Sequence, residues 1–302
     1  MEYNKDELFY DACNEDDLDT VTKFLNDPEF DPNKPVYIIS KIDAIFNMFY
    51  TPFVVACTFN SINVIRYFLE DSRVDPCKRN CDGISGFHVV CINGRTDIVK
   101  FLLEDSRINP CEADDDGQTP LHSACEKGFI EIVKLLLEDN RIDPCQLNSE
   151  DRTPLYLACR YGFVEIVRLL LEDGRINPDS DDNHGYSAFY YACDNNNVEI
   201  VKMLAEDGRF DLSDLYGTFH SACENNEIDL AKILIDCGRD NCIDIYQSLG
   251  EYGTPLHMAC ENDNIDIIKC ILANCDNVIL PSIIFSDEVE KLLKPFRDNT
   301  SN

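Results

Sequence analysis

At 302 residues, the chain is long enough for two ordinary domains or for one extended repeat array. Hydrophobic residues make up 44% of it, which is ample for a folded core and argues against disorder. Fifty-seven acidic and 26 basic side chains give a formal net charge of −31, which disfavours nucleic acid and anionic lipid as partners and favours basic proteins. Solubility alone is the alternative explanation for this charge.

The N-terminus does not resemble a secretory signal. Its first ten residues, MEYNKDELFY, are acidic and lack a basic start followed by an apolar run. No uncharged apolar run of about 18 residues occurs, so we expect no membrane-spanning helix. The sequence therefore predicts a cytoplasmic protein, with the nucleus as the alternative.

A dipeptide at a fixed spacing organises the chain. Ala-Cys recurs between Ala56 and Ala192 in steps of 34 residues, with Val90-Cys91 filling one phase. Further copies, at less regular spacing, start at Ala12, Ala222 and Ala259. A fixed period of this length is typical of a repeat array, and the sequence holds eight copies.

Each copy carries the same order of local signals, seen best in residues 117–145. Thr119-Pro120 predicts the start of a short helix, because threonine caps a helix N-terminus and proline fits the first helical position. Gly128 predicts its end. A longer helix is expected over 129–139, where apolar residues recur at helical spacing. A turn containing Asn or Asp then leads into the next copy.

These signals resemble the ankyrin repeat, which carries a Thr-Pro-Leu-His start, a small pair, a central Gly and a Glu-Ile-Val-Lys-Leu-Leu stretch. The resemblance covers roughly residues 5–280. It implies an all-α solenoid of about eight helix-loop-helix units with short β-hairpin fingers and a concave binding face. One departure is the 34-residue period, whose extra residue falls in the Leu-Glu-Asp-x-Arg loop. The other is a cysteine where the family often has Asn, at Cys77, Cys111 and Cys145.

The first copy and the segment after it depart from the pattern. A polar, degenerate first copy is expected, because a terminal repeat faces water on one side. The link from Asn33 to Thr51 is ten residues longer than the link from Cys111 to Thr119, and its extra residues, near 34–50, are strongly apolar. Exposed apolar surface would mark an interaction site, whereas the alternative is that the segment folds back over the neighbouring helices. Its candidate partner contacts are Tyr37, Ile38 and Phe46.

The family resemblance also implies where a partner lies. Ankyrin partners usually lie across the hairpin tips and the inner short helices. Carried over by position, the tips are Ile84, Gln118, Arg152 and Tyr186, and the inner-helix candidates are Leu157, Arg160, Tyr161 and Tyr191. Tyr and Arg crowd into the fifth and sixth copies and are enriched at binding hot spots, so we expect contact there. Tyr156 and Tyr190 have another explanation, because they replace the family His.

The 16 cysteines and a recurring His-x-x-Cys pattern raise the question of disulfides or metal. Eight cysteines occupy the repeated small position, where free Cys packs as a small hydrophobe. Equivalent cysteines on packed helices lie farther apart than the Cα separation of about 7 Å that a disulfide tolerates. A pair such as His122 and Cys125 supplies two of the four ligands that structural zinc needs. We expect reduced, buried thiols, no bound metal and no cofactor.

Catalytic patterns are also lacking. Carboxylate pairs such as Glu104-Asp105 recur in phase with Arg107, whereas catalytic pairs are singular. We interpret them as a ladder on the solvated edge, where each ion pair contributes about 0–1 kcal/mol. No glycine-rich phosphate loop, HExxH helix or nucleophile elbow occurs. The chain is not expected to be an enzyme.

The C-terminal copies carry two further signals. The seventh copy has lost residues around 212–215, which should shorten one finger. After the eighth copy, Ser286 is a helix N-cap followed by two acidic residues, so a helix is predicted from Asp287 to Phe296. We assign the repeat array to residues 1–285, and a C-terminal capping helix and tail to residues 286–302.

The sequence thus predicts a monomer that binds a partner protein non-covalently, as a scaffold, adaptor or inhibitor. Two alternatives remain open. The chain could be an acidic decoy that masks a basic segment of its partner, or a structural spacer without a specific ligand.

Overall fold

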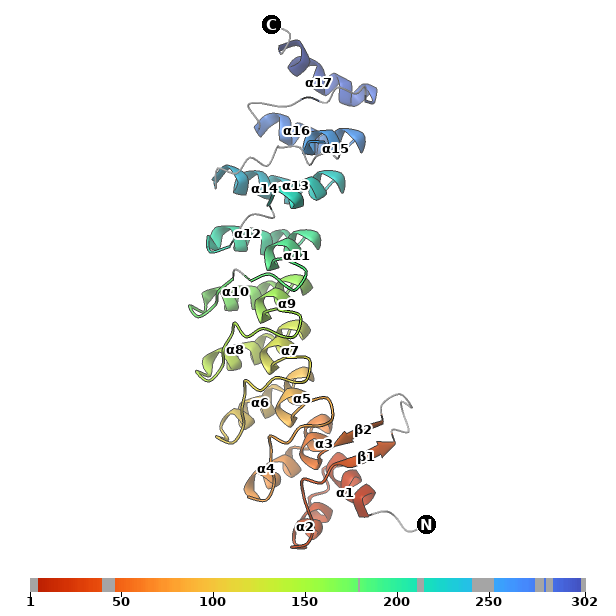
Figure 1. Cartoon of the computed structure of the whole chain (residues 1–302), viewed down its shortest axis with the longest axis vertical. Coiled ribbons are helices and arrows are strands. Elements are labelled where there is room, and N and C mark those ends of the chain that lie inside the picture. The colour runs from red at the N-terminus through yellow and green to blue at the C-terminus, as the bar shows by residue number, and fades with distance from the viewer. Residues whose placement is uncertain are drawn as a thin grey trace. The chain divides into compact units, whose positions relative to one another are not determined.

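The computed structural model describes residues 5–39, 47–178, 180–210, 215–240, 253–274, 280 and 285–299, and it confirms the predicted helical repeat. Helices follow one another in pairs joined by short loops (Figure 1). Within the described ranges the eight pairs are α1 (Lys5–Asn14) and α2 (Leu18–Leu25), α3 (Pro52–Phe59) and α4 (Ile62–Glu70), α5 (Gly86–Ile92) and α6 (Thr96–Leu103), α7 (Pro120–Lys127) and α8 (Ile130–Glu138), α9 (Pro154–Tyr161) and α10 (Val164–Glu172), α11 (Ala188–Asp194) and α12 (Val198–Asp207), α13 (Leu215–Glu224) and α14 (Ile228–Asp240), and α15 (Pro255–Glu261) and α16 (Ile265–Asn274). A last helix, α17 (Asp287–Asn299), follows them.

The helices divide between two compact units. Unit 1 comprises residues 1–158 and 172–176, and unit 2 comprises residues 159–171 and 177–302. The division falls within α9 and at the end of α10, so the first four helix pairs belong to unit 1 and the last three to unit 2.

The first helix of five pairs begins after a Ser or Thr N-cap, in α3, α5, α7, α11 and α15, and α7 shows the predicted signals most completely. The Thr119 side chain accepts a hydrogen bond from the backbone N–H of His122, and Pro120 occupies the first turn, where its missing N–H costs nothing. Gly128 ends the helix with φ of +78°, a left-handed conformation that suits glycine. The α7 start and stop therefore follow from three residues.

The second helix of each pair supplies a stripe of core residues. In α8 the side chains of Ile132, Val133 and Leu136 are buried, at the helical spacing expected for one face. The equivalent residues Ile166, Val167 and Leu170 of α10 are also buried. Since one helix pair cannot cover this stripe alone, stacking of neighbouring pairs within a unit stabilises both.

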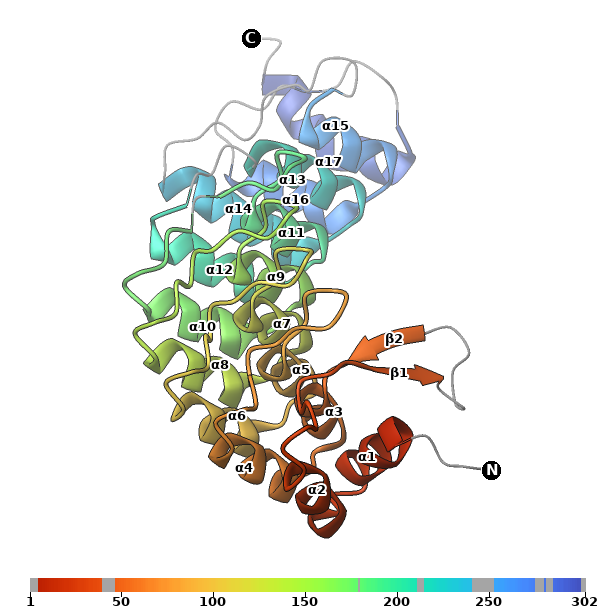
Figure 2. The same ribbon diagram turned by 60° about the horizontal axis from the view of Figure 1, so that its bottom comes forward.

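The insertion after the first pair forms a β-hairpin. Strands β1 (Val36–Ile39) and β2 (Asn47–Tyr50) pair antiparallel, with Val36 opposite Tyr50 and Ile39 opposite Asn47. Figure 2 shows the hairpin projecting from the helices beside α1 and α3. Elsewhere in the described chain, the fingers between pairs are tight turns without further strands, although an isolated antiparallel bridge joins Asp181 to Ser187 in one of them.

The arginines of the outer loops between helix pairs form hydrogen bonds to backbone carbonyls in addition to the predicted ion pairs. Arg141 bonds Asp139 at 2.6 Å, and this contact lowers the pKa of the Asp139 carboxyl. The same guanidinium also donates to the backbone carbonyls of Ile108 at 2.9 Å and Leu103 at 3.1 Å, in the preceding repeat. The expectation of an ion pair alone is therefore incomplete, because Arg141 also satisfies the Leu103 carbonyl, which the end of α6 leaves without an intrahelical partner, and the loop carbonyl of Ile108.

This arginine contact recurs along the chain at a constant spacing. Arg107 donates to the carbonyl of Leu69, Arg175 to that of Leu137, and Arg209 to that of Leu171, each 38 residues earlier. Arg73, in the loop after the second helix pair, donates to the carbonyl of Leu25 in the first pair, 48 residues earlier. The difference of ten residues is the length of the insertion, so the hairpin loops out without disturbing this contact.

The cysteines fall into two groups. Those at the repeated small position, such as Cys91 and Cys125, are fully buried as predicted, and the described cysteines form no disulfide. Cys77 and Cys145 are only partly buried, and their thiols donate to the backbone carbonyls of Arg107 and Arg175 in the next repeat, at 2.9 and 3.3 Å. The cysteine that replaces the family Asn thus links neighbouring outer loops.

The described termini carry helices where the sequence predicts them. Helix α17 begins at Asp287 as expected and extends to Asn299, three residues beyond the predicted end. It buries Val289 and Leu293 and contacts α16. The predicted shortening of the seventh finger, around 212–215, falls on residues of which only Leu215, the first residue of α13, is described. Within the described residues, none of the helices has the length and apolar character needed to cross a membrane.

Candidate protein-binding surface

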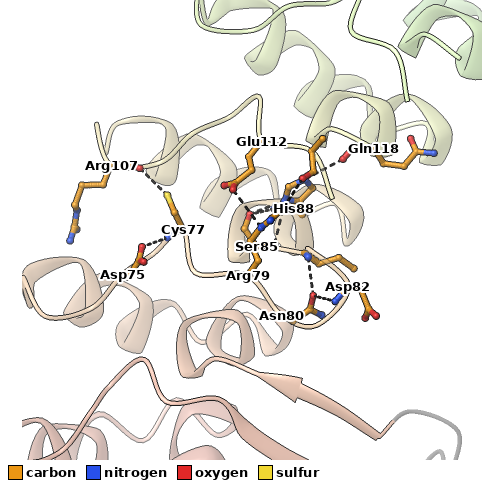
Figure 3. Close-up of polar contacts among 12 residues, drawn as sticks. Asp75, Cys77, Arg79, Asn80, Asp82, Ser85, His88, Arg107, Glu112 and Gln118 are labelled. Atoms are coloured by element: carbon orange, nitrogen blue, oxygen red, sulfur yellow. Dashed lines mark hydrogen bonds and ion pairs between the residues drawn. The ribbon is translucent and has the colours of Figure 1, made fainter. Parts of the chain in front are cut away.

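Buried histidines fix the fingers to the inner helices. The ring Nδ1 of His122 accepts a hydrogen bond from the backbone N–H of Thr119 at 3.2 Å, so Nε2 carries the proton and donates to the carbonyl of Arg152 at 3.0 Å. His88 makes the same bridge from Ser85 to the carbonyl of Gln118, at 3.3 Å on each side (Figure 3). Each histidine therefore joins its own helix start to the next finger.

Burial lowers the pKa of both histidines to about 4, against the usual 6.5. Both rings are fully buried, and the neutral form suits the acceptor and donor roles that the geometry requires. In the described residues no group of three or more His, Cys, Asp or Glu side chains is arranged to hold a metal ion. Their hydrogen bonds give these histidines a structural role.

Each finger is a tight turn closed by an Asn or Asp side chain. In the finger of Figure 3, Asn80 Oδ1 accepts from the backbone N–H groups of Asp82 at 3.0 Å and Ile84 at 2.8 Å. The same pair of bonds recurs in the next three fingers, which Asp114, Asn148 and Asp182 close. These four residues recur every 34 positions, a signal that could have located the turns from the sequence.

The predicted tip residues lie at the C-terminal ends of these turns. Each takes part, through its backbone, in the hydrogen bonds that close its turn; these residues are Ile84, Gln118, Arg152 and Tyr186. The turns themselves present mostly acidic side chains, which the positional analogy missed. In unit 1 these are Asp82, Asp115, Asp116, Glu150 and Asp151.

Neighbouring fingers of unit 1 are joined through their backbones. Asp115 donates its N–H to the carbonyl of Asp82 at 3.2 Å, and Ser149 donates its N–H to the carbonyl of Asp116 at 3.0 Å. The acidic side chains are therefore carried on a connected series of turns rather than on independent loops. Arg152 partly balances this charge, since it pairs with Glu150 and lies 5.4 Å from the ring centre of the buried Tyr156.

Unit 2 holds a cluster of tyrosines at the start of α11. Tyr186 and Tyr190 stack with ring centres 4.4 Å apart, and Tyr191 meets them edge-on at 6.0 and 5.4 Å. The guanidinium of Arg160, from the end of α9, lies 5.1 Å from the centre of the Tyr191 ring. We call Arg160, Tyr186, Tyr190 and Tyr191 the tyrosine cluster.

The tyrosine cluster is open to solvent. Tyr186 keeps 40% of its surface exposed, and Tyr161, next to Arg160 in sequence, keeps 49%. Leu157 is different, because it is only 3% exposed and its side chain is not available to a partner without rearrangement. Of the inner-helix candidates, the structure thus leaves Arg160, Tyr161 and Tyr191 at the surface.

The candidates in the insertion are only partly described. Tyr37 and Ile38 lie in β1, where the backbone alone is described, and Phe46 lies outside the described residues. Whether their side chains are exposed or packed stays a prediction. Tyr50, at the end of β2, is partly buried, and its pKa is raised by burial and by the nearby Asp82 carboxylate.

A family model for ankyrin repeats matches residues 53–148, 140–214 and 217–280, which is well over half of the chain. This chain is an ankyrin repeat protein. Ankyrin repeats are protein–protein interaction modules and are generally not enzymes. The resemblance inferred from the repeated Thr-Pro-Leu-His and Ala-Cys motifs is therefore confirmed.

A solved ankyrin repeat structure has the same fold. The ankyrin repeat domain of Bcl-3, described as a unique member of the IκB protein family, aligns with a TM-score of 0.62 and 24% sequence identity. The alignment covers 73% of this chain and 98% of that domain. At this identity the likeness shows the fold and leaves the partner open. Among curated proteins, a sequence search finds no significant match.

Proposed function

We propose that this ankyrin repeat protein binds a partner protein through the tyrosine cluster of unit 2. The observation that carries the proposal is the exposure of Tyr186, whose ring stacks on Tyr190 and stands beside the Arg160–Tyr191 pair. Tyrosine and arginine dominate binding hot spots because they bury large areas at a low cost in side-chain entropy.

The arrangement of the cluster also favours binding. Stacked rings hold one another in place before a partner arrives, so less side-chain freedom is lost on association. Arg160 covers one face of Tyr191, and the exposed surface of Tyr186 remains for a partner. Asp194 lies one helical turn beyond Tyr190 and Tyr191 and is exposed, which suits a partner that carries a basic group next to an apolar one.

The test is affinity purification from the native cell with quantitative mass spectrometry. The double variant Tyr186→Ala/Tyr191→Ala should lose most of a specific partner, while Tyr67→Ala on the outer helix α4 should retain it. Circular dichroism and urea unfolding check that both variants fold. A partner recovered equally by all three proteins would refute the site, and the absence of any saturable partner would favour the spacer.

The acidic turns of unit 1 support a second candidate, in which the chain masks a basic segment of its partner. Asp82, Asp115 and Asp116 are held on joined turns, and the whole chain carries a net charge of −31. Such binding would weaken strongly as salt is raised from 50 to 300 mM (about a twofold shorter Debye length), and it would not respond to the tyrosine variants. Binding that responds to the tyrosine variants and little to salt would favour the first candidate.

A further inference from the structure

In unit 2, the first helix of each of the last three pairs ends in an acidic residue. Asp194 is the last residue of α11, Glu224 of α13 and Glu261 of α15, and all three residues are exposed. The last carbonyls of a helix carry partial negative charge, so a carboxylate at this end is repelled and disfavours the helix. The chain therefore keeps negative charge at three places where it is unfavourable for folding.

The second helices of the same pairs differ in their charges. Each pairs one acidic residue with a lysine, at 3.2–3.8 Å, and these pairs are Lys202–Glu206 in α12, Lys232–Asp229 in α14 and Lys269–Asp266 in α16. By contrast, α11, α13 and α15 contain no Lys or Arg. Glu261 lies 3.3 Å from the ring of His257. Unit 2 thus carries its uncompensated negative charge on the side that its first helices form.

The three acidic helix ends follow one another along unit 2, and we call Asp194, Glu224 and Glu261 the acidic row. Helix α11 packs against α13, and α13 packs against α15. The amide of Asn264, in the turn after α15, donates to the carbonyl of Glu224 at 3.2 Å and so ties two of these ends together. Since packed helices lie about 8–10 Å apart, successive carboxylates are about one such step from each other.

Asp194 connects the acidic row to the tyrosine cluster. It lies three and four residues beyond Tyr191 and Tyr190, so the three side chains share one face of α11. The residue three positions before the acidic end is Ser221 in α13, which is exposed, and Met258 in α15, which is partly exposed. Neither adds a positive charge between the carboxylates. The surface therefore offers aromatic rings at one end and carboxylates along the rest.

We propose that the segment bound here is an extended chain with an aromatic anchor on the tyrosine cluster and basic side chains over the acidic row. The segment belongs to the partner of the function proposed above, on which this inference rests. An extended chain advances about 3.3 Å per residue, so a step of about 8–10 Å corresponds to about three residues. Lys or Arg should therefore recur at every third position, and the positive charge of Arg160 keeps the basic part away from α9.

The test uses synthetic probes and the full chain in about 50 mM salt. The probes are the capped peptide Phe-Ser-Lys-Ser-Ser-Lys-Ser-Ser-Lys and the same sequence reversed, because either chain direction satisfies the spacing. Calorimetry should show saturable binding of one of them. Its affinity should exceed by about fivefold or more that of Phe-Ser-Lys-Lys-Lys-Ser-Ser-Ser-Ser or its reverse, whose composition and charge are the same but whose lysines cannot reach all three carboxylates.

Two matched triple variants localise the contact. Asp194→Asn/Glu224→Gln/Glu261→Gln removes the acidic row, and Glu206→Gln/Asp229→Asn/Asp266→Asn removes the same number of charges from the second helices. The first variant should bind the spaced peptide about tenfold more weakly, since each exposed pair contributes roughly two- to fivefold, whereas the second should bind it like the original chain. The urea midpoint of the first variant should equal or exceed that of the original chain, because the acidic row opposes its own helix ends.

Four results would overturn the proposal. Equal weakening by the two triple variants would show attraction to the overall charge of the chain. Equal affinity for the spaced and contiguous peptides would show that the spacing is not recognised. Full peptide binding by Tyr186→Ala/Tyr191→Ala would separate the acidic row from the tyrosine cluster, and no saturable binding would remove the site.

The native partner distinguishes this inference from the function proposed above. A partner lost by the tyrosine variant and retained by the acidic-row variant would leave the tyrosine cluster as a binding site for a segment of other chemistry, and only the present inference would fail. A partner retained by both variants would refute both. Loss of the partner by both, with retention by the second-helix variant, is the expected result.

Discussion

Acid should destabilise unit 1 through its two buried histidines as the pH falls from 7 toward 5. Burial lowers the pKa of His88 and His122 to about 4, whereas the unfolded chain takes up these protons near 6.5. The folded state therefore binds fewer protons in this window, so its stability is complete above pH 6.5 and falls as the pH drops toward about 4. We expect the loss to be reversible.

The magnitude follows from the size of the shift. A pKa of about 4 instead of 6.5 corresponds to about 3 kcal/mol per histidine, of which about 2 kcal/mol is lost by pH 5. Two histidines together should lower the free energy of unfolding by about 4 kcal/mol between pH 7 and pH 5. With a urea slope of about 2–3 kcal/mol per molar, the midpoint should fall by roughly 1–2 M.

The chain itself offers the control. Tyrosine occupies the histidine position in two other repeats, at Tyr156 and Tyr190, so His88→Tyr/His122→Tyr should be tolerated sterically and has no group that titrates in this range. Urea unfolding, followed by circular dichroism at pH 7 and pH 5, should show a pH response in the original chain that largely disappears in the variant. An equal response in both proteins would refute the role of these histidines.

Two other predictions concern the outer loops and the fingers. Arg141→Ala should lower the free energy of unfolding by about 1–2 kcal/mol, measured with urea at pH 7, because it removes bonds to the carbonyls of Ile108 and Leu103. The exposure of the arginine side chain limits the loss. A change below about 0.3 kcal/mol would contradict this role. Gly117→Ala should lower the free energy of unfolding by about 1–3 kcal/mol, since φ is +73° and the added Cβ would lie 2.7 Å from the Ser149 backbone nitrogen. The control Gly174→Ala, whose Cβ would have nothing within 4 Å, should leave the stability unchanged or raise it slightly. Equal midpoints for the two glycine variants would contradict the close approach of the fingers.

Local signals determined most of the fold. The start and end of α7 follow from Thr119, Pro120 and Gly128, and the buried stripe of α8 follows from helical spacing, so both are predictable without tertiary information. The donation by Arg141 to carbonyls 33 and 38 residues earlier could not be predicted this way, because it depends on how closely two outer loops approach.

The candidate surface was less predictable for the same reason. Leu157 and Tyr191 occupy the same position in successive repeats, so both were predicted as partner contacts. In the structure Leu157 is buried, whereas Tyr191 is partly exposed. The acidic turns were missed because the family analogy selected Ile84 and Gln118, which follow the turns. The Asn or Asp that closes each turn recurs every 34 residues, and this recurrence would have located the turns in the sequence.

The arginine contacts also determine where this chain can change its length. An added residue in an outer loop would move the arginine away from the carbonyl that it reaches in the preceding repeat, and would shift the cysteine link as well. In the finger that follows the first helix pair, by contrast, ten additional residues lie between Leu25 and Arg73, and Arg73 still donates to the Leu25 carbonyl. Engineered epitopes, reporter peptides or binding loops should therefore be tolerated in the fingers and rejected in the outer loops.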